Sequence, residues 1–257
     1  MLHFDTATLL MQGQRPYQED AVISCYPVGA SFGFTVLSDG MGGHAGGDLA
    51  SKICIREVQQ TILENTSDLR QFKQSISSVL NTGLEKANAA IRMFTERTPE
   101  FAGMGATVVS AVNFENELYW ASVGDSLLLL CREGTIFRLN ADHSLAPEID
   151  ELVRQGKLTQ AEADDHVDRS VLTSALTGKQ INKIDCTDEP LTLLPGDILI
   201  IASDGLEYLS QEQIIKLVEH YTEEPSESIA RRFKSAINVL AHAEQDNVSM
   251  SIVKVLQ

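Results

Sequence analysis

The stretch Ala106-Thr-Val-Val-Ser-Ala-Val-Asn-Phe-Glu-Asn-Glu-Leu-Tyr-Trp-Ala-Ser122 gives the first indication of the fold. Two runs rich in β-branched and aromatic residues, 106–112 and 118–122, flank a polar segment, and this arrangement predicts a β-hairpin. The runs 127–131 and 136–139 repeat the pattern around a second polar turn. Two hairpins in succession indicate antiparallel sheets rather than alternating βαβ units.

Helical patterns precede these hairpins in the chain. Apolar residues recur every three or four positions from Leu69 to Phe94, which predicts a long amphipathic helix with Ser67 or Asp68 as its N-cap. A shorter helix is predicted at about 48–63. A helix with one long apolar face has to lie on a broad surface, and a sheet is the simplest such surface.

Short apolar runs bounded by polar, glycine or proline residues predict the remaining strands. These strands are 6–11, 21–26, 32–37, 191–194, 198–202 and 248–255. Two more helices are predicted, one opened by a capping box of Ser210 and Gln213 and one at about 226–240. Strands joined as hairpins, with helices inserted in pairs, predict an α+β fold of mainly antiparallel sheets layered with helices.

The composition is that of a globular protein, with 43% hydrophobic and 22% charged residues among 257. No linker or low-complexity block interrupts the chain, so we expect a single domain over residues 1–257. The polar stretch at about 142–183 is too long for an ordinary connection. We expect it to be a flap that contains up to two short helices.

The net charge of −16 argues against binding to nucleic acids or to anionic membranes. No apolar run reaches the length of roughly 20 residues that a bilayer-spanning helix needs, and the first residues do not form a signal-peptide pattern. These observations predict a cytoplasmic protein. The cysteines have no metal-binding or redox spacing and are expected to be reduced and mostly buried. They are Cys25, Cys54, Cys131 and Cys186.

Acidic residues stand next to the ends of several predicted strands. The apolar runs that begin at Phe34 and Leu199 both end in Ser-Asp-Gly, and oxygen ligands of this kind suit hard cations such as Mg²⁺ or Mn²⁺. The acids in such positions are Glu19, Asp20, Asp39, Asp125, Asp204 and Asp246. Asp-Gly is also the commonest turn dipeptide. The residues alone therefore leave a metal site and a set of ordinary turns both open.

The glycine-rich segment Gly40-Met-Gly-Gly-His-Ala-Gly-Gly47 follows a strand and opens a helix, as a dinucleotide-binding loop does. The next predicted element is another helix where that motif needs a strand, and no acid is placed to bind a ribose, so this interpretation is the weaker one. No cysteine is followed six positions later by an arginine, so the usual cysteine-phosphatase loop is absent. Arg15 lies close to the Glu19-Asp20 pair and could hold an anion through two hydrogen bonds.

Two longer motifs carry a family resemblance. They are Met11-Gln-Gly-Gln-Arg-Pro-Tyr-Gln-Glu-Asp20 and Ser38-Asp-Gly-Met-Gly-Gly-His-Ala-Gly-Gly47. Shorter ones follow in order: Gly105-Ala-Thr107, Val123-Gly-Asp-Ser126, Leu172-Thr-Ser-Ala-Leu-Thr-Gly178, Ser203-Asp-Gly-Leu206 and Asp246-Asn247. From about residue 8 to residue 255 the chain resembles the metal-dependent protein phosphatases, the type 2C serine/threonine phosphatases, in their bacterial single-domain form.

The resemblance implies a four-layer α/β/β/α sandwich of two mainly antiparallel sheets flanked by helix pairs, with a two-metal centre at the sheet edges. By position, Asp39 bridges both metals and the Gly40 carbonyl binds one of them. Asp204 and Asp246 complete the shell of the second metal. The residues implied to hold metal-bound waters are Glu19 and Asp20.

The resemblance also assigns the remaining site residues. Asp125, with Asp204, matches a third metal position, so two or three divalent cations, Mn²⁺ or Mg²⁺, are implied. Arg15 is expected to grip the phosphate and His44 to protonate the leaving alkoxide. The residues expected to support the ligands without touching the metals are Ser203 and Asn247. The chain departs from the family pattern at Tyr208, where an acid is common, and at Leu127, where an arginine is common.

The function implied is hydrolysis of phosphoserine and phosphothreonine in proteins by a metal-bridging hydroxide, without a covalent intermediate. The expected partners are serine/threonine-phosphorylated proteins, including a kinase or its substrates, and the expected state is a monomer. Two alternatives remain at this point. One is a catalytically silent family member that binds phosphoproteins as a regulatory module, and the other is a nucleotide-binding oxidoreductase built on the glycine-rich segment.

Overall fold

The computed structural model describes residues 2–43, 45–220 and 223–257. Two antiparallel sheets form its centre. The first sheet has the strand order β1-β12-β11-β7-β8. Its strands are β1 (His3–Met11), β12 (Val248–Leu256), β11 (Ile198–Ala202), β7 (Leu127–Arg132) and β8 (Thr135–Arg138).

The second sheet has the strand order β10-β6-β5-β3-β2. Its strands are β10 (Leu191–Thr192), β6 (Glu117–Val123), β5 (Val108–Phe114), β3 (Phe32–Met41) and β2 (Asp20–Cys25). Two short strands add to it: β4 (Gly105–Ala106) pairs with β3, and β9 (Asp185–Cys186) pairs with β6. Both predicted hairpins are present, β5–β6 and β7–β8.

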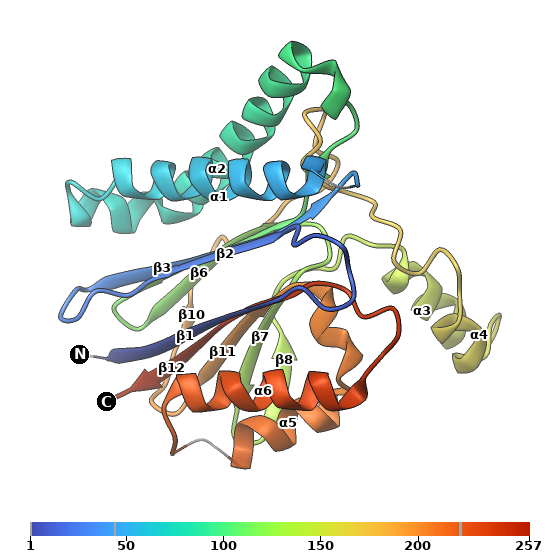
Figure 1. Cartoon of the computed structure of the whole chain (residues 1–257). Helices are drawn as coiled ribbons and strands as arrows, with labels where there is room; N and C mark the ends of the chain where they lie inside the picture. Colours follow the sequence, from blue (N-terminus) through green and yellow to red (C-terminus); the bar gives the residue numbers. More distant parts are fainter. Residues whose placement is uncertain (1, 44, 221–222) are drawn as a thin grey trace.

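Helices cover the outer face of each sheet (Figure 1). The helices α1 (Ala45–Glu64) and α2 (Leu69–Arg97) lie on the second sheet, and α5 (Gln211–His220) and α6 (Ser226–Leu240) lie on the first. The predicted four-layer arrangement is therefore confirmed. Two short helices, α3 (Ala146–Arg154) and α4 (Gln160–Asp164), lie apart from these layers within the stretch 142–183.

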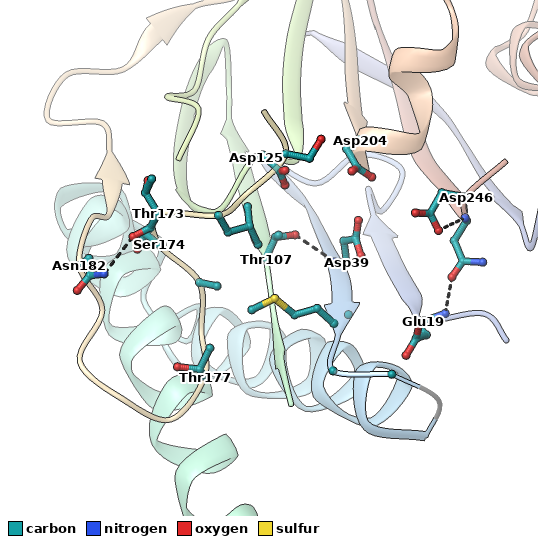
Figure 2. Close-up of a pocket in the computed structure, with 18 of the residues that line it drawn as sticks. Glu19, Asp39, Thr107, Asp125, Thr173, Ser174, Thr177, Asn182, Asp204 and Asp246 are labelled. Carbon is teal, nitrogen blue, oxygen red and sulfur yellow. Dashed lines mark hydrogen bonds between the residues drawn. The ribbon is translucent and has the colours of Figure 1, made fainter. Parts of the chain in front are cut away.

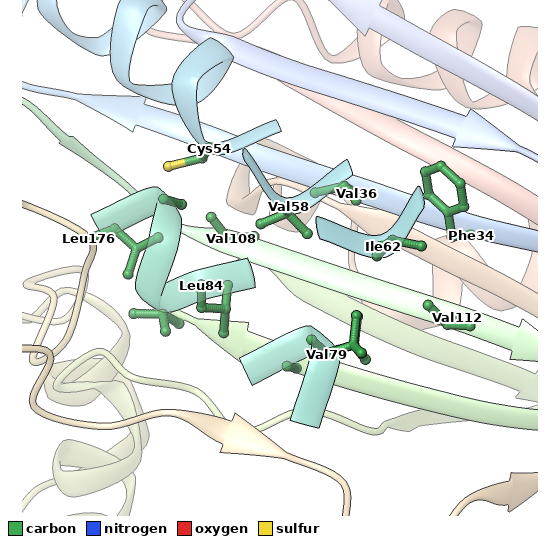
Figure 3. Close-up of a cluster of buried hydrophobic side chains, with 14 of the residues drawn as sticks. Phe34, Val36, Cys54, Val58, Ile62, Val79, Leu84, Val108, Val112 and Leu176 are labelled. Carbon is green, nitrogen blue, oxygen red and sulfur yellow. The ribbon is translucent and has the colours of Figure 1, made fainter. Parts of the chain in front are cut away.

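Three apolar cores hold the layers together. Figure 3 shows the core between the α1–α2 pair and the second sheet, where Val58 of α1 and Leu84 of α2 meet Val36 of β3. A second core lies between the first sheet and α5–α6, and a third lies between the two sheets. Leu176, from the polar stretch, is fully buried in the first of these cores. Leu176 is thus one of the points at which this segment is anchored to the body of the protein.

Local sequence signals account for most of the helix boundaries. Asp68 caps α2 by accepting the Arg70 and Gln71 amide protons, as predicted. The predicted capping box of Ser210 and Gln213 is present at the start of α5. One feature differs from the simplest expectation: β10 and β11 are neighbours in sequence but belong to different sheets.

The cysteines form no disulfides, and two of them, Cys54 and Cys131, are buried, while the other two are only partly covered. Among the described residues, no helix combines the length and the apolar character that crossing a bilayer would need.

The alternation of side chains along β3 aims the strand end at the opposite sheet. Phe34 and Val36 point toward α1 and α2, whereas Leu37 belongs to the core between the sheets. Because side chains in a strand alternate between faces, Asp39 continues the face of Leu37. The position of the candidate site therefore follows from which side chains of β3 face the opposite sheet.

Candidate metal centre

A cavity of about 850 Å³ opens where β3 and β11 end at the same edge of the sandwich. Figure 2 shows Asp39, Asp125 and Asp204 pointing toward one another at its floor, with Asp246 beside Asp204. These side chains come from strand ends that are far apart in sequence. The structure thus brings together four of the acids that the sequence identified as candidate ligands.

Asp20 joins this group through the pairing of β2 with β3. In the antiparallel register, Asp20 lies opposite Asp39. Asp20 is only 4% exposed, and its carboxylate accepts a hydrogen bond of 2.8 Å from the buried Ser203 hydroxyl. Ser203 is therefore a link between the two sheets, and it lies directly before Asp204.

The acids lower one another's tendency to ionise. Desolvation and the Asp204 and Asp246 carboxylates raise the pKa of Asp20 to about 6, although hydrogen bonds from hydroxyl groups oppose the shift. Desolvation, followed by the Asp204 and Asp142 carboxylates, raises the pKa of Asp125 to about 7. The pKa of Asp39 lies well above its usual value for the same reasons. The site therefore gathers more negative charge than it can hold in its ionised form.

The Asp39 and Asp204 carboxyl groups lie close enough to act on each other's pKa, and the pKa of both is raised. A carboxyl group with a raised pKa keeps its proton more readily, and a divalent cation can take the place of such a proton. Within the described residues, no three acidic, histidine or cysteine side chains already surround one point as ligands. The oxygen-only donor set fits a hard cation, and an ion would draw these carboxylates closer together.

Arg15 and Asp246 form an ion pair at the rim of the cavity. The Asp246 carboxylate, which accepts the hydrogen bond, raises the pKa of the Arg15 guanidinium. Both side chains are partly exposed, with 53% and 33% of their surfaces accessible. A guanidinium in this position can reach an anion that enters the cavity.

Asn247 fixes the loop that carries Arg15. Its side-chain amide donates to the carbonyls of Gln12 (2.7 Å) and Tyr17 (3.0 Å), and its side-chain oxygen accepts the Glu19 amide proton at 2.7 Å. Three bonds from one buried side chain thus hold both ends of the loop. This arrangement accords with a supporting role for Asn247, which remains a prediction.

Glu19 is oriented differently from the other acids. In Figure 2 its carboxylate points away from Asp39, and it lies against the first turn of α1. A Cβ on Gly47 would be only 2.4 Å from a Glu19 carboxylate oxygen, and a Cβ on Gly40 would be 2.1 Å from the Gly47 carbonyl oxygen. Both glycines are required by this close approach. The structure does not bring the Glu19 carboxylate into the acid cluster.

His44 lies outside the described residues, so its predicted role as an acid stays a prediction. Its neighbours Gly42 and Gly43 line the cavity, as does Gly40.

Several residues that the sequence did not single out support the cluster. Thr107 accepts the Asp39 amide proton (3.2 Å) and shares a 2.7 Å hydrogen bond with the Ser126 hydroxyl. Arg138, from β8, donates to the Asp125 carbonyl at 2.6 Å and pairs with Asp142. Thr107 could have been suspected from its Gly-Ala-Thr motif, but no local signal indicates Arg138.

His143 connects Asp125 to the far wall of the cavity. Its side chain, which is 4% exposed, accepts the amide proton of Gly124 at 3.2 Å. Its carbonyl accepts the amide proton (2.7 Å) and the hydroxyl proton (2.9 Å) of Thr173. Desolvation lowers the pKa of His143, which keeps the ring neutral. The Asp125 turn and the wall at Thr173 are therefore held by one residue.

Residues 10–158 match the family described as Protein phosphatase 2C. The chain belongs to this family. The protein phosphatase 2C match covers more than half of the chain, and it includes Asp20, Asp39 and Asp125 of the acid cluster.

Relatives and solved structures of this family extend over nearly the whole chain. A "Serine/threonine phosphatase stp" of Listeria welshimeri is 28% identical over 223 residues, which is 85% of this chain and 83% of the relative. The crystal structure of the Mycobacterium tuberculosis serine/threonine phosphatase PstP/Ppp superposes with a TM-score of 0.83 at 26% identity, covering 99% of each chain. The catalytic domain of PstP in complex with two manganese ions gives a TM-score of 0.79 at 26% identity, covering 100% of each chain. The family assignment makes the chain a phosphatase, as its motifs predict.

Proposed function

We propose that the chain is a metal-dependent protein phosphatase that removes phosphate from phosphoserine and phosphothreonine, with the acid cluster as its metal centre. The observation that carries the proposal is the convergence of Asp39, Asp125, Asp204 and Asp246 on one cavity beside Arg15, with the buried Asp20 paired opposite Asp39. Family membership supports the same activity. The relative with two manganese ions supports Mn²⁺ or Mg²⁺ as the cofactor.

Two or three divalent cations, when bound, supply the chemistry: they activate a water for direct attack on phosphorus and neutralise charge on the phosphoryl oxygens. Asp39, Asp204 and Asp246 are the proposed direct ligands, together with the Gly40 carbonyl. Asp125 would serve a third position with Asp204. Asp20, and Glu19 if its carboxylate turns from α1, would orient bound waters.

The chain's own residues then position the substrate. Arg15 binds the phosphoryl oxygens through its planar guanidinium, which matches their geometry. Asn247 holds the Arg15 loop in place, and Ser203 holds Asp20. His44 is proposed to give a proton to the leaving alkoxide, because an alkoxide departs poorly unless it is protonated.

We further propose that residues 1–257 act as one catalytic unit with 142–183 as a flap beside the cleft. Nine residues of that stretch, from Ser170 to Asn182, line the cavity, which supports this division. A cytoplasmic monomer that acts on phosphoproteins, including a kinase or its substrates, is the setting we propose. The net charge of −16 supports a protein that does not bind nucleic acid.

The test is phosphate release from a phosphothreonine peptide. We expect activity with Mn²⁺, loss of activity in EDTA and recovery when Mn²⁺ is added back. The control is Asp188→Asn, the same chemical change on an exposed residue away from the cleft, which should retain full activity. Phosphopeptide binding without phosphate release at any metal concentration would instead identify the chain as a silent binding module.

A further inference from the structure

The wall of the cleft opposite the acid cluster has an unusual charge for this protein. The chain has 36 acidic and 20 basic residues, but the segment 170–183 contains no acidic residue and two lysines. The preceding segment, 142–169, has more than twice as many acidic as basic residues. The wall segment is therefore a local cationic surface on a strongly acidic protein.

This wall, the last part of the flap, is fixed to the body of the protein. Leu176 exchanges two backbone hydrogen bonds of 2.9 Å with Ala106, and its side chain lies in the core under α2. Gly178 follows with φ of +78°, and a Cβ there would be 2.8 Å from the Cα of Arg92. The chain thus makes a tight turn directly against α2, which only glycine allows.

Asn88 of α2 holds this turn from both sides. Its side-chain oxygen accepts the Gly178 amide proton at 2.8 Å, and its side-chain nitrogen donates to the Lys179 carbonyl at 2.6 Å. These two bonds fix the backbone of Gly178 and Lys179, so the point from which the Lys179 side chain starts is defined. Figure 2 shows the loop that contains this turn, with Thr173, Thr177 and Asn182 labelled along it.

Lys179 stands at the junction of two cavities. Together with Gln180 it lines both the catalytic cleft and a second cavity of about 580 Å³. The second cavity runs beside α2 and is lined by Arg92 and, at another point, by Glu85. Lys179 and Arg92 are both exposed, and neither forms an ion pair with any residue in the described part of the chain. Two unpaired cations therefore border a groove that continues from the cleft.

The combined size of the two cavities exceeds what a phosphorylated side chain needs. A polypeptide substrate would fill them if its phosphorylated residue entered the acid cluster while its neighbours extended past Lys179. Carboxylates on those neighbours would meet unpaired cations, whereas lysine or arginine side chains would be repelled. The charge pattern of the groove thus favours one class of substrate.

We propose that Lys179 and Arg92 form a subsite for acidic residues that flank the phosphorylated residue of the protein substrate. This inference rests on the proposed phosphatase function and adds a substrate class to it. Lys179, which the Asn88 clamp holds, is the main determinant, and Arg92 extends the subsite along α2.

The experiment measures kcat/KM on phosphothreonine peptides with a neutral background, in which a single glutamate is moved through each position on either side of the phosphothreonine. The readout is kcat/KM for each acidic peptide divided by kcat/KM for the neutral peptide, both measured with the same enzyme preparation. A loss of active protein lowers both values equally and therefore cancels. We expect wild type to prefer glutamate at positions on one side by about two- to fivefold, an effect typical of partly exposed ion pairs. The preference should decrease as salt is added.

The variants assign this preference to residues. Lys179→Gln is expected to remove most of the preference, Arg92→Gln a smaller part, and Lys179→Glu to favour lysine over glutamate at the same positions. Lys234→Gln is the matched control, because Lys234 is also an exposed cation but lies on α6 in the opposite helix layer, and it should keep the wild-type ratio.

The outcomes separate this subsite from the function on which it rests. If wild type hydrolyses phosphopeptides but does not distinguish glutamate from neutral residues, the subsite is wrong and the phosphatase function stands. A preference for glutamate that persists in Lys179→Glu would overturn the assignment to this groove. If wild type with Mn²⁺ hydrolyses no phosphopeptide at all, both proposals fail.

Discussion

The two Ser-Asp-Gly segments of this protein have the same sequence, but different residues of the tripeptide face the space between the sheets. In the first segment this residue is the aspartate, and in the second it is the serine. In β3, Asp39 continues the face between the sheets, and Ser38 points toward the helix layer, where it donates to the Thr107 carbonyl at 2.7 Å. After β11 the roles are exchanged. Ser203 continues the face of Ile201 between the sheets, where it bonds to Asp20.

Asp204 reaches the cleft only because its strand ends. β11 stops at Ala202, and a 3₁₀ turn, η2 (Asp204–Tyr208), begins at Asp204 itself. β3 instead runs through its aspartate to Met41. Identical tripeptides thus deliver a carboxylate by two routes, one by strand alternation and one by strand termination. The comparison teaches that a motif predicts chemistry, whereas the surrounding contacts decide its geometry.

The largest difference between the two segments is expected in metal dependence. Asp39 is the most central acid, since the Asp20, Asp204, Asp125 and Asp246 carboxylates all act on its pKa. Asp39→Asn should therefore lower kcat/KM by more than about 100-fold at every Mn²⁺ concentration, beyond the range typical of residues that only support a ligand. The kcat/KM of Asp204→Asn should also fall, but it should recover partly when Mn²⁺ is in excess. Metal titrations of both variants check this, and equal recovery would remove the distinction.

The glycines that follow the two aspartates provide a second comparison. A Cβ on Gly40 would meet three backbone atoms within 2.6 Å, whereas a Cβ on Gly205 would meet only the Asn247 carbonyl oxygen so closely, at 2.1 Å. We expect Gly40→Ala to destabilise the fold by about 3 kcal/mol or more and Gly205→Ala by somewhat less. Thermal unfolding in EDTA measures both. Gly46→Ala, with 3.3 Å to Met104, is the control and should change stability little.

Replacing the two serines should change the free energy of unfolding by amounts that differ less. Ser203→Ala removes a donor to the buried Asp20 carboxylate and an acceptor of the Ser249 amide proton, so two buried groups lose a partner. Ser38→Ala deprives one carbonyl of a donor. The expected losses are about 2 kcal/mol and about 1 kcal/mol, measured by urea unfolding. A larger loss for Ser38→Ala would contradict the interpretation that Ser203, and not Ser38, faces the space between the sheets.

The smallest effect concerns pH in the absence of metal. The pKa values of Asp20 and Asp125 are raised in the folded protein to about 6 and about 7, so the folded state binds protons that the unfolded state has released. Stability in EDTA should therefore increase as the pH falls from 8 to 5.5, by a few degrees in Tm. Excess Mn²⁺ should reverse this slope, because protons compete with the ion.

Asp204→Asn sharpens the same test. The Asp204 carboxylate contributes to the raised pKa of both Asp20 and Asp125. The variant should melt at or above the wild-type temperature in EDTA at pH 8, and it should show a flatter pH dependence. A variant that is clearly less stable in EDTA would mean that Asp204 acts mainly as a structural hydrogen-bonding residue.

The sequence predicted the fold well where the signal is local. The long helix from Asp68, the capping box at Ser210 and both hairpins depend on patterns within a few residues. The crossing between β10 and β11 was not visible, because Pro195-Gly196-Asp197 reads as an ordinary turn, and only the partners of each strand show that they belong to different sheets.

The site shows the same limit. The strand-end acids could be identified from the sequence, but Arg138 and His143 could not. Arg138 donates to the Asp125 carbonyl and His143 accepts the Gly124 amide proton, and only the fold brings these groups together. The direction of the Glu19 carboxylate was equally hidden, since it depends on the space left by Gly47 of α1. Contacts between a side chain and a distant backbone have no signature in the sequence.

The ion pair between Arg15 and Asp246 links two binding events. In this structure the guanidinium that is proposed to bind phosphate is held by a carboxylate that is proposed to bind metal. If Asp246 held a metal ion, it would no longer hold Arg15, which would then be available for the phosphate, and metal occupancy and phosphate affinity would be thermodynamically coupled. Such coupling is reciprocal, and phosphate must therefore strengthen metal binding by the same factor. Under the proposed roles, this one ion pair would make phosphate bind more tightly to the metal-loaded site than to the metal-free site.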